Sequence, residues 1–407
     1  MALHPGNCGC AAAGRQQGPC PVKLRLRRAC DFEKRLVDAV PDSSLFLHSD
    51  SLGRKVRTGS WQDQSVGTYT KLSACIASRE ASTAISYVEF FLQEAKVIYA
   101  LYTQINPDLR AFMHSRGMSA AEVSDADRNV VDLLRLPSGE PFDRDALMSD
   151  VEQHARLCSD AIDADQWAAA DENAEAMRET WRRVKDRDGD HSYGLIDAIV
   201  KRFGEGVIGD MWDSVIRPLF NWRYANFDIA KRPWDESLDQ LMMVACESMR
   251  SHLVGVERTG DFELVELDDR FILRFDPCGS GGRIVRGDLV EGTPSRMEDP
   301  YNWGVSEEPH SWNHGKSGIC HYCTHCIRLM EEMPIDRFGY PLRVVDPPVY
   351  PDADPLNRQY CQWQMFKDPT AVPVEFYSRV DRVKPEVFGS NGAPDADEGP
   401  ATFFGKG

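Results

Sequence analysis

Three cysteines at a strict two-residue spacing dominate one short stretch of the chain. Residues 318–326 read GICHYCTHC, which places Cys320, Cys323 and Cys326 within a single turn-length segment, with His321 and His325 between them. Thiolate is the metal-binding form of cysteine, and a tight turn can direct several thiolates toward one centre. The spacing therefore predicts a Cys/His metal cluster, and a fold that must form around it.

The cluster needs one more partner, because zinc takes four protein ligands in structural sites and three plus water in catalytic ones. Cys278 is the first candidate, since in FDPCGSGGR it stands where a strand ends and a glycine-rich loop begins. Cys361, in QYCQWQMF, is the second, although its position on an apolar strand face favours a place in the core. His321 or His325 could also supply the ligand, because imidazole binds zinc equally well.

A 4Fe–4S cluster is an alternative to zinc, because Cys-x-x-Cys-x-x-Cys with one distant cysteine also binds such clusters. The ferredoxin pattern continues with a fourth Cys followed by Pro, and residues 327–330 contain neither. A third possibility is a non-enzymatic binding or regulatory protein in which zinc only holds a small unit together.

Other residues near the cysteines suggest a role in catalysis. His314, in EEPHSWNHGKSG, could act as an acid or base near neutral pH. Arg283 and Ser280, in the loop CGSGGR, could bind an anionic group of a substrate through a charge-assisted hydrogen bond and loop amides. We therefore assign His314 as the predicted catalytic residue, and Arg283 and Ser280 as the predicted substrate-binding residues.

Composition narrows the class of partner. The 407 residues carry a formal charge of −17, which disfavours nucleic acid and anionic membrane surfaces as partners. The N-terminus has no secretory signal pattern, so we expect a cytoplasmic protein. In that reducing compartment the cysteines are better explained by metal binding, catalysis or inert burial than by disulfides. We expect a small-molecule substrate, and a homo-oligomer is compatible with the sequence.

The chain divides into four parts by pattern. Residues 1–30 predict a poorly ordered segment, 31–255 a helical domain, 256–380 an α+β metal-binding unit, and 381–407 a tail. In the third part, DFELVEL and RFILRF alternate as two strands of a hairpin, and PLRVVD and QYCQWQMF predict two more. The expected class is α+β: a mainly helical N-terminal domain followed by a small antiparallel sheet with the Cys/His cluster.

Three local expectations concern helix ends and turns. KDRDGDHS, residues 185–192, predicts a polar turn between helices, because closely spaced Asp and Gly are typical of turns. Pro107 is expected just beyond the end of the apolar helix that contains ISYVEFF, and Pro334 is expected to stop a short helix in CTHCIRLMEEM. We also expect the helices to meet the C-terminal unit at the site, since ligand sites favour such junctions.

Two segments resemble the L-2-amino-thiazoline-4-carboxylic acid hydrolase family. They are IVKRFGEGVIGDMWDSVI and, later, the order of a strand, a cysteine loop and QYCQWQMF, which together cover about the last half of the chain. The resemblance implies hydrolytic opening of a small C–N or C–S heterocycle and assigns no residue. The leading hypothesis is thus a zinc-dependent hydrolase of a small organic molecule, with Cys278, Cys320, Cys323 and Cys326 as metal ligands.

Overall fold

The computed structural model describes residues 45–390, except 51, 137, 225–226 and 352–359. The predicted poorly ordered segment 1–30 and residues 391–407 of the predicted tail lie outside the described residues.

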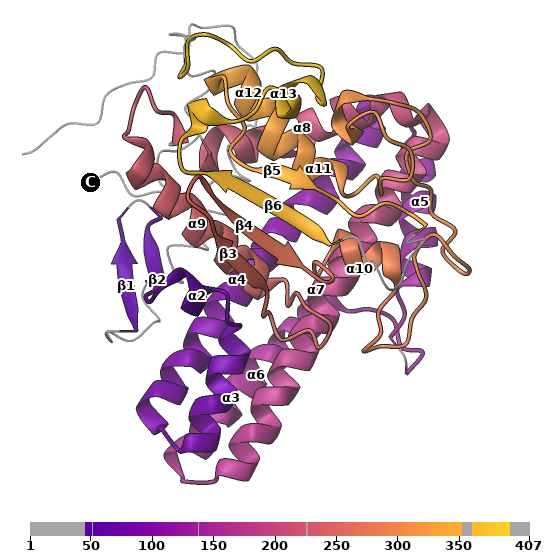
Figure 1. Cartoon of the computed structure of the whole chain (residues 1–407). Helices are drawn as coiled ribbons and strands as arrows, with labels where there is room; N and C mark the ends of the chain where they lie inside the picture. Colours follow the sequence, from indigo (N-terminus) through magenta and orange to yellow (C-terminus); the bar gives the residue numbers. More distant parts are fainter. Residues whose placement is uncertain (1–44, 51, 137, 225–226, 352–359, 391–407) are drawn as a thin grey trace, which may run out of the picture.

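Long helices form the first two thirds of the described chain (Figure 1). In chain order the α-helices are α2 (Trp61–Gln64), α3 (Thr68–Ser78), α4 (Ala81–Ser115), α5 (Ala120–Leu133), α6 (Arg144–Asp163), α7 (Trp167–Phe203), α8 (Ile208–Arg223), α9 (Trp234–Ser251), α10 (Gly281–Arg286), α11 (Thr324–Ile327), α12 (Met333–Phe338) and α13 (Glu375–Ser378). No helix among these residues is long and apolar enough to cross a membrane.

Local sequence signals set several of the helix ends. Ser119 and Glu122 form a capping box at the start of α5, each satisfying a backbone N–H of the first turn. Asp143 accepts a hydrogen bond from the N–H of Ala146 at the start of α6. The 37-residue helix α7 ends at Gly204, whose φ of 83° is accessible to glycine at little cost.

The larger sheet has the strand order β3-β4-β6-β5, and all neighbours are antiparallel. Its strands are β3 (Glu263–Glu266), β4 (Arg270–Phe275), β5 (Val344–Asp346) and β6 (Cys361–Phe366). The predicted hairpin and the two later strands are therefore confirmed. A separate pair of strands, β1 (Phe46–Ser49) and β2 (Arg54–Arg57), was not predicted and lies within the segment expected to be helical.

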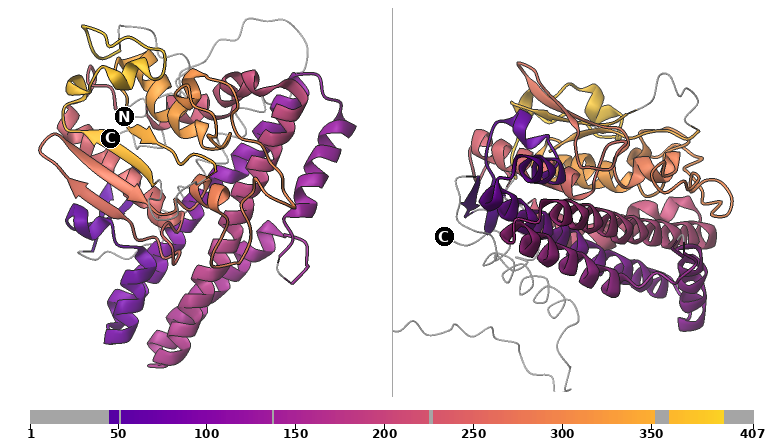
Figure 2. Two further views of the ribbon diagram at one scale, coloured as in Figure 1. Left: turned by 45° about the vertical axis from the view of Figure 1, so that its right-hand side comes forward. Right: turned by 90° about the horizontal axis from the view of Figure 1, so that it is seen from below.

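The sheet and the C-terminal helices cover one end of α4 and α7, whose other ends extend with α3 and α6 beyond the sheet (Figures 1 and 2). One hydrophobic core includes Phe90 and Trp181 of the helices together with Leu273 and Trp363 of the sheet. The α+β class, with a mainly helical N-terminal region and small antiparallel sheets, is thus confirmed.

The polar turn predicted at residues 185–192 is wrong, because α7 runs through this stretch without a break. Lys185, Asp186, Asp188 and Asp190 are all buried there. Buried charges require oppositely charged or hydrogen-bonding partners, and these come from residues far along the chain, such as Arg258. The polar sequence belongs to the interior of the molecule rather than to a surface turn.

Both expectations about proline are also wrong. Pro107 lies inside α4, where Leu109 and Phe112 on its C-terminal side are buried and hold the following turns in place. Pro334 lies in the first turn of α12, after a π-helical turn at Arg328–Glu332. A proline is tolerated in the first turn, because the N–H that it lacks would have no partner within the helix.

Candidate functional site

The three-cysteine segment forms consecutive turns that lead into α11. Cys320 makes an antiparallel bridge with Val305. The N–H of Cys323 then donates to the carbonyl of Cys320 at 2.8 Å, and the N–H of Cys326 donates to that of Cys323 at 3.1 Å. The first cysteine is therefore held by extended backbone, and the other two by tight turns.

The loop after β4 brings Cys278 to the same end of the sheet as Cys361. Phe275 pairs with Cys361 across β4 and β6, and Cys278 follows Phe275 by three residues. The N–H of Gly282 donates to the sulfur of Cys278 at 2.9 Å. A hydrogen bond from Cys361 and this N–H lower the pKa of Cys278 to about 6 against the opposing effect of burial, while the same bond raises the pKa of Cys361.

Two consecutive glycines at the start of α10 bring the two cysteine loops together. A Cβ atom added at Gly281 would overlap the sulfur of Cys323, and one added at Gly282 would stand 3.3 Å from the sulfur of Cys278. The two sulfurs therefore rest against neighbouring residues of one short segment. Only a residue without a side chain leaves room for the sulfur of Cys323.

Five thiols gather at this point. A hydrogen bond with Cys320, burial and the nearby Cys278 and Cys361 raise the pKa of Cys323. Burial and the nearby Cys278 raise the pKa of Cys326. We call the set of five the thiol group: Cys278, Cys320, Cys323, Cys326 and Cys361. All of them are buried except Cys326, which is half-buried.

The long helices contact the three-cysteine segment directly, as expected from the sequence. The hydroxyl groups of Tyr102 in α4 and Tyr322 are 2.7 Å apart. The indole N–H of Trp212 in α8 donates to the hydroxyl of Thr324 at 2.7 Å. The side chains of Tyr102 and Trp212 are buried, so the helices close off one side of the thiol group.

The two histidines of the segment have different neighbours. His325 Nε2 lies 3.3 Å from the sulfur of Cys326, and its Nδ1 lies 2.5 Å from the carbonyl oxygen of Tyr322. His321 Nε2 instead lies 3.9 Å from a carboxylate oxygen of Glu205. Burial lowers the pKa of both histidines, so the neutral imidazole is favoured in each. His325 is thus the histidine adjacent to the thiol group.

His314, the predicted acid or base, belongs to a buried group of charges. Its Nε2 lies 3.2 Å from a carboxylate oxygen of Glu331. Arg379 donates to the same carboxylate, as does the N–H of Val345. These contacts hold His314 within the packed interior, and its catalytic role stays a prediction.

The predicted substrate-binding residues lie on either side of the glycine pair. Arg283 is buried, and its guanidinium bonds to Asp190 and donates to the backbone carbonyl of Asp186 at 3.2 Å. Its charge therefore faces carboxylates of the chain itself. Ser280 Oγ lies 4.0 Å from the sulfur of Cys278, which places it beside the thiol group. Binding of a substrate by either residue stays a prediction.

Within the described ranges, no three His, Cys, Asp or Glu side chains are arranged to hold one metal ion. The structure therefore brings the four predicted cysteine ligands together, with Cys361 as a fifth, but does not show a preformed single-ion site. The metal cluster of the predicted fold stays a proposal.

Several residues of this region were not identified from the sequence. The role of Gly281 and Gly282 had a signal, since two glycines follow a cysteine, but the sequence does not reveal that Cys323 packs against them. Tyr102 had no signal, because a lone tyrosine in an apolar helix is ordinary core. Lys185, whose amine bonds to the loop of Cys278, was placed in the turn that the structure replaces with helix.

Comparisons with protein-family models, curated proteins and solved structures gave no match. The resemblance to the thiazoline hydrolase family therefore stays a prediction.

Proposed function

We propose that the protein is an iron–sulfur protein in which Cys278, Cys320, Cys323 and Cys326 bind a 4Fe–4S cluster that transfers single electrons. The observation that carries the proposal is the contact of the Cys323 and Cys278 sulfurs with Gly281 and Gly282, together with the hydrogen bonds that link Cys278 to Cys361 and Cys323 to Cys320. The raised pKa of Cys323 and of Cys326 keeps these two thiols protonated in the free protein, whereas the pKa of Cys278 is lowered to about 6. A metal centre would replace these protons and stabilise the thiolates.

The spacing of the cysteines in the sequence supports a cluster over a single ion, because three cysteines at two-residue intervals with a fourth on a distant segment are typical of 4Fe–4S binding. One zinc ion needs donor atoms that converge on a single point at about 2.3 Å from each sulfur. No three side chains within the described ranges do so. In a 4Fe–4S cluster each cysteine binds a different iron, so the four sulfurs stand around a larger body. The N–H of Gly282 would then donate to a ligand sulfur, a contact that tunes the potentials of such clusters.

The surroundings support electron transfer over metal-assisted hydrolysis. A hydrolytic metal activates a water at an open position and works with a nearby acid or base. The predicted base His314 is bonded to Glu331, and the predicted anchor Arg283 to Asp190. A buried cluster needs neither a free base nor a free substrate anchor to accept and donate electrons. The zinc hydrolase therefore ranks below the iron–sulfur protein.

A closed zinc site is the second candidate. Cys278 is hydrogen-bonded to Cys361, and Cys320 to Cys323, so the thiols also form two close pairs. Two such pairs could move together around one tetrahedral ion, which would then hold the C-terminal unit to the helices.

Metal analysis of the full chain distinguishes the two candidates. The protein is purified without oxygen, added metal or chelator, and its iron, acid-labile sulfide, zinc and visible absorption are measured. We expect about four irons and four sulfides per chain, with broad absorption that decreases on reduction. Stoichiometric zinc without iron would support the second candidate, and the absence of both metals would contradict both.

Single substitutions then identify the ligands. Cys320→Ser, Cys323→Ser, Cys326→Ser and Cys278→Ser should each lose iron, because a hydroxyl does not replace a thiolate. Cys158→Ser is the matched control, since Cys158 is a buried thiol of α6 that donates to the carbonyl of Ala170. The control should keep the iron content of the unchanged protein.

A further inference from the structure

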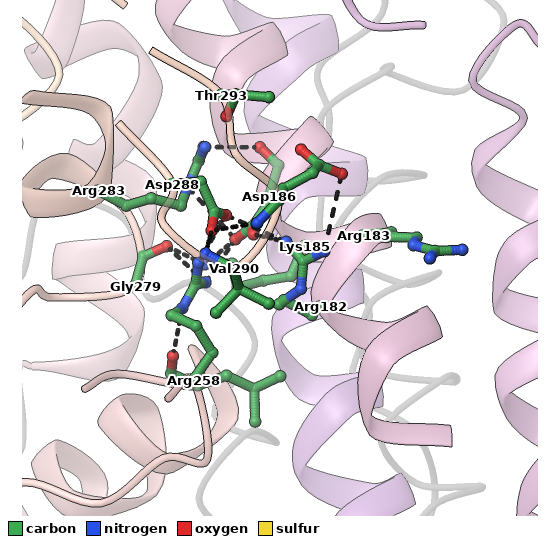
Figure 3. A network of polar contacts seen from close by, with 12 residues as sticks. Arg182, Arg183, Lys185, Asp186, Arg258, Gly279, Arg283, Asp288, Val290 and Thr293 are labelled. Carbon is green, nitrogen blue, oxygen red and sulfur yellow. Dashed lines mark hydrogen bonds and ion pairs between the residues drawn. The ribbon is translucent and has the colours of Figure 1, made fainter. Parts of the chain in front are cut away.

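The backbone next to Cys278 is held by the amine of a lysine in the long helix α7. The amine of Lys185 donates to the carbonyl of Gly279, the residue that follows Cys278, and to the carbonyl of His252 at 3.2 Å. It also forms an ion pair with Asp186 at 2.7 Å. Figure 3 shows Lys185 and Gly279 within this network of buried charges. The three donors of the ammonium group each have an acceptor.

The network around Lys185 is rigid because its members are buried and mutually paired. Lys185 and Asp186 have no exposed side-chain surface. Asp186 is paired with Arg258 at 2.7 Å and with Arg182 at 3.1 Å (Figure 3). Moving any member would leave a buried charge without its partner, which is strongly unfavourable. Lys185 therefore holds the carbonyl of Gly279 from a fixed position.

The other end of the same short segment is also anchored to α7. Arg283 donates to the carbonyl of Asp186 at 3.2 Å and is bonded to Asp190. At the near end, Gly279 packs so closely on the carbonyl of His252 that an added Cβ would overlap it. Residues 279–283 are thus fixed at both ends, and they include the two glycines against which the sulfurs of Cys278 and Cys323 lie.

We infer that Lys185 is a positioning residue for the metal centre: by holding the carbonyl of Gly279, it fixes Cys278 where that thiol can act as a ligand. The inference rests on the proposed function for its link to metal. It also has a consequence in the metal-free protein, because without Lys185 the Gly279 carbonyl keeps only the longer 3.5 Å contact with Arg258 among its described side-chain donors, and the backbone beside the thiol of Cys278 loosens.

The test compares Lys185→Met with Arg187→Met in the full chain. Arg187 lies on the same helix and is also buried, but it holds the carbonyl of Leu134 and the carboxylate of Glu291 instead of the cysteine loop. Both variants remove one buried basic side chain together with its hydrogen bonds, so both should lose stability. Only Lys185→Met should lose iron, or alter the absorption and reduction potential of any cluster that remains.

A second measurement does not depend on metal. Metal-free protein is treated with iodoacetamide, and the labelling rate of each cysteine peptide is followed by mass spectrometry. We expect Cys278 to react several-fold faster in Lys185→Met than in Arg187→Met, with Cys158 equal in both. Equal labelling of Cys278, together with equal metal content in the two variants, would overturn the inference.

The two measurements separate the inference from the proposed function. If the unchanged protein takes up neither iron nor zinc, the proposed function fails, and the labelling of Cys278 alone decides whether Lys185 positions the loop. If the unchanged protein binds iron and the two variants behave alike, the proposed function survives and the positioning role is rejected.

Discussion

The backbone of Gly281 lies against the sulfur of Cys323, so closely that a methyl group on Gly281 would overlap that sulfur. This contact joins the loop after β4 to the three-cysteine segment, although the two residues are far apart in the sequence. The pairing of β4 with β6 then adds Cys361. The thiol group is therefore a product of tertiary packing.

The first prediction is that Gly281→Ala disrupts the metal centre. The new methyl group would push the sulfur of Cys323 away from its place, because the neighbour is a backbone-anchored side chain in a packed interior. We expect a large loss of iron or zinc per chain, measured by metal analysis. Gly206→Ala is the control, since an added Cβ there meets no atom within 4 Å. Wild-type metal content in Gly281→Ala would contradict the placement of Cys323 as a ligand.

The second prediction concerns Cys361, the fifth thiol. Its hydrogen bond to Cys278 would fall on a ligand sulfur in the proposed cluster. Such bonds stabilise the more negative, reduced cluster, so Cys361→Ala should keep its iron and lower the reduction potential by on the order of tens of millivolts. A redox titration followed by absorption measures this shift. Loss of iron in Cys361→Ala would instead identify Cys361 as a ligand.

Local patterns predicted much of the fold. The hairpin of β3 and β4 and the strands β5 and β6 follow from alternation over a few residues, which the sequence displays directly. The Cys-x-x-Cys-x-x-Cys spacing predicted a local cysteine centre for the same reason. The position of Cys361 beside Cys278 could not be predicted, because it depends on the register of two strands separated by more than eighty residues.

The buried charges of α7 show what local sequence patterns could not predict. Asp186 and Asp190 in KDRDGDHS have the composition of a surface turn, and their partners Arg258, Arg283 and Arg296 lie much later in the chain. A helix is recognised in a sequence by the regular repeat of its apolar residues. A helix face that is charged and buried through ion pairs lacks this repeat and is therefore missed. The error at residues 185–192 hid Lys185, a helix residue that contacts the loop of Cys278.

The third prediction tests a buried ion pair between α4 and α9. Arg250 donates to Glu94 at 2.8 Å, and both side chains are almost fully buried. Arg250→Met would leave the carboxylate without its partner, so the free energy of unfolding should fall by about 3–5 kcal/mol in urea denaturation. Arg217→Met is the control, because its pair with Asp213 is partly exposed and should cost less than about 1 kcal/mol.

A companion variant checks the cause of that loss. Replacing Glu94 by Leu together with Arg250→Met removes both charges, so the double variant should recover part of the lost stability. If the double variant is as unstable as the sum of the two single changes, the loss comes from packing and the ion pair is not its source.

The fourth prediction is a pH dependence of stability that arises from Asp188. Burial raises the pKa of this carboxyl to about 6, against the opposing effect of Arg144, whose Nε is 2.8 Å away. His191 and Asp145 also act on Asp188, the first lowering and the second raising its pKa. In the unfolded chain the carboxyl titrates near its ordinary value of about 3.9. Between these two values the folded protein binds a proton that the unfolded chain has released.

This carboxyl therefore favours folding at low pH, and its contribution is lost as the pH rises through about 6. Asp188→Asn carries a neutral amide at every pH, and Arg144 is 20% exposed, so water can solvate its charge in the variant. The free energy of unfolding of the unchanged protein minus that of Asp188→Asn should fall by on the order of 2–3 kcal/mol between about pH 4 and about pH 7. Urea denaturation at several pH values measures both proteins, and the titrating groups that do not interact with Asp188 cancel in the difference. A difference that stays flat, or rises with pH, would mean that the folded protein does not raise the pKa of Asp188.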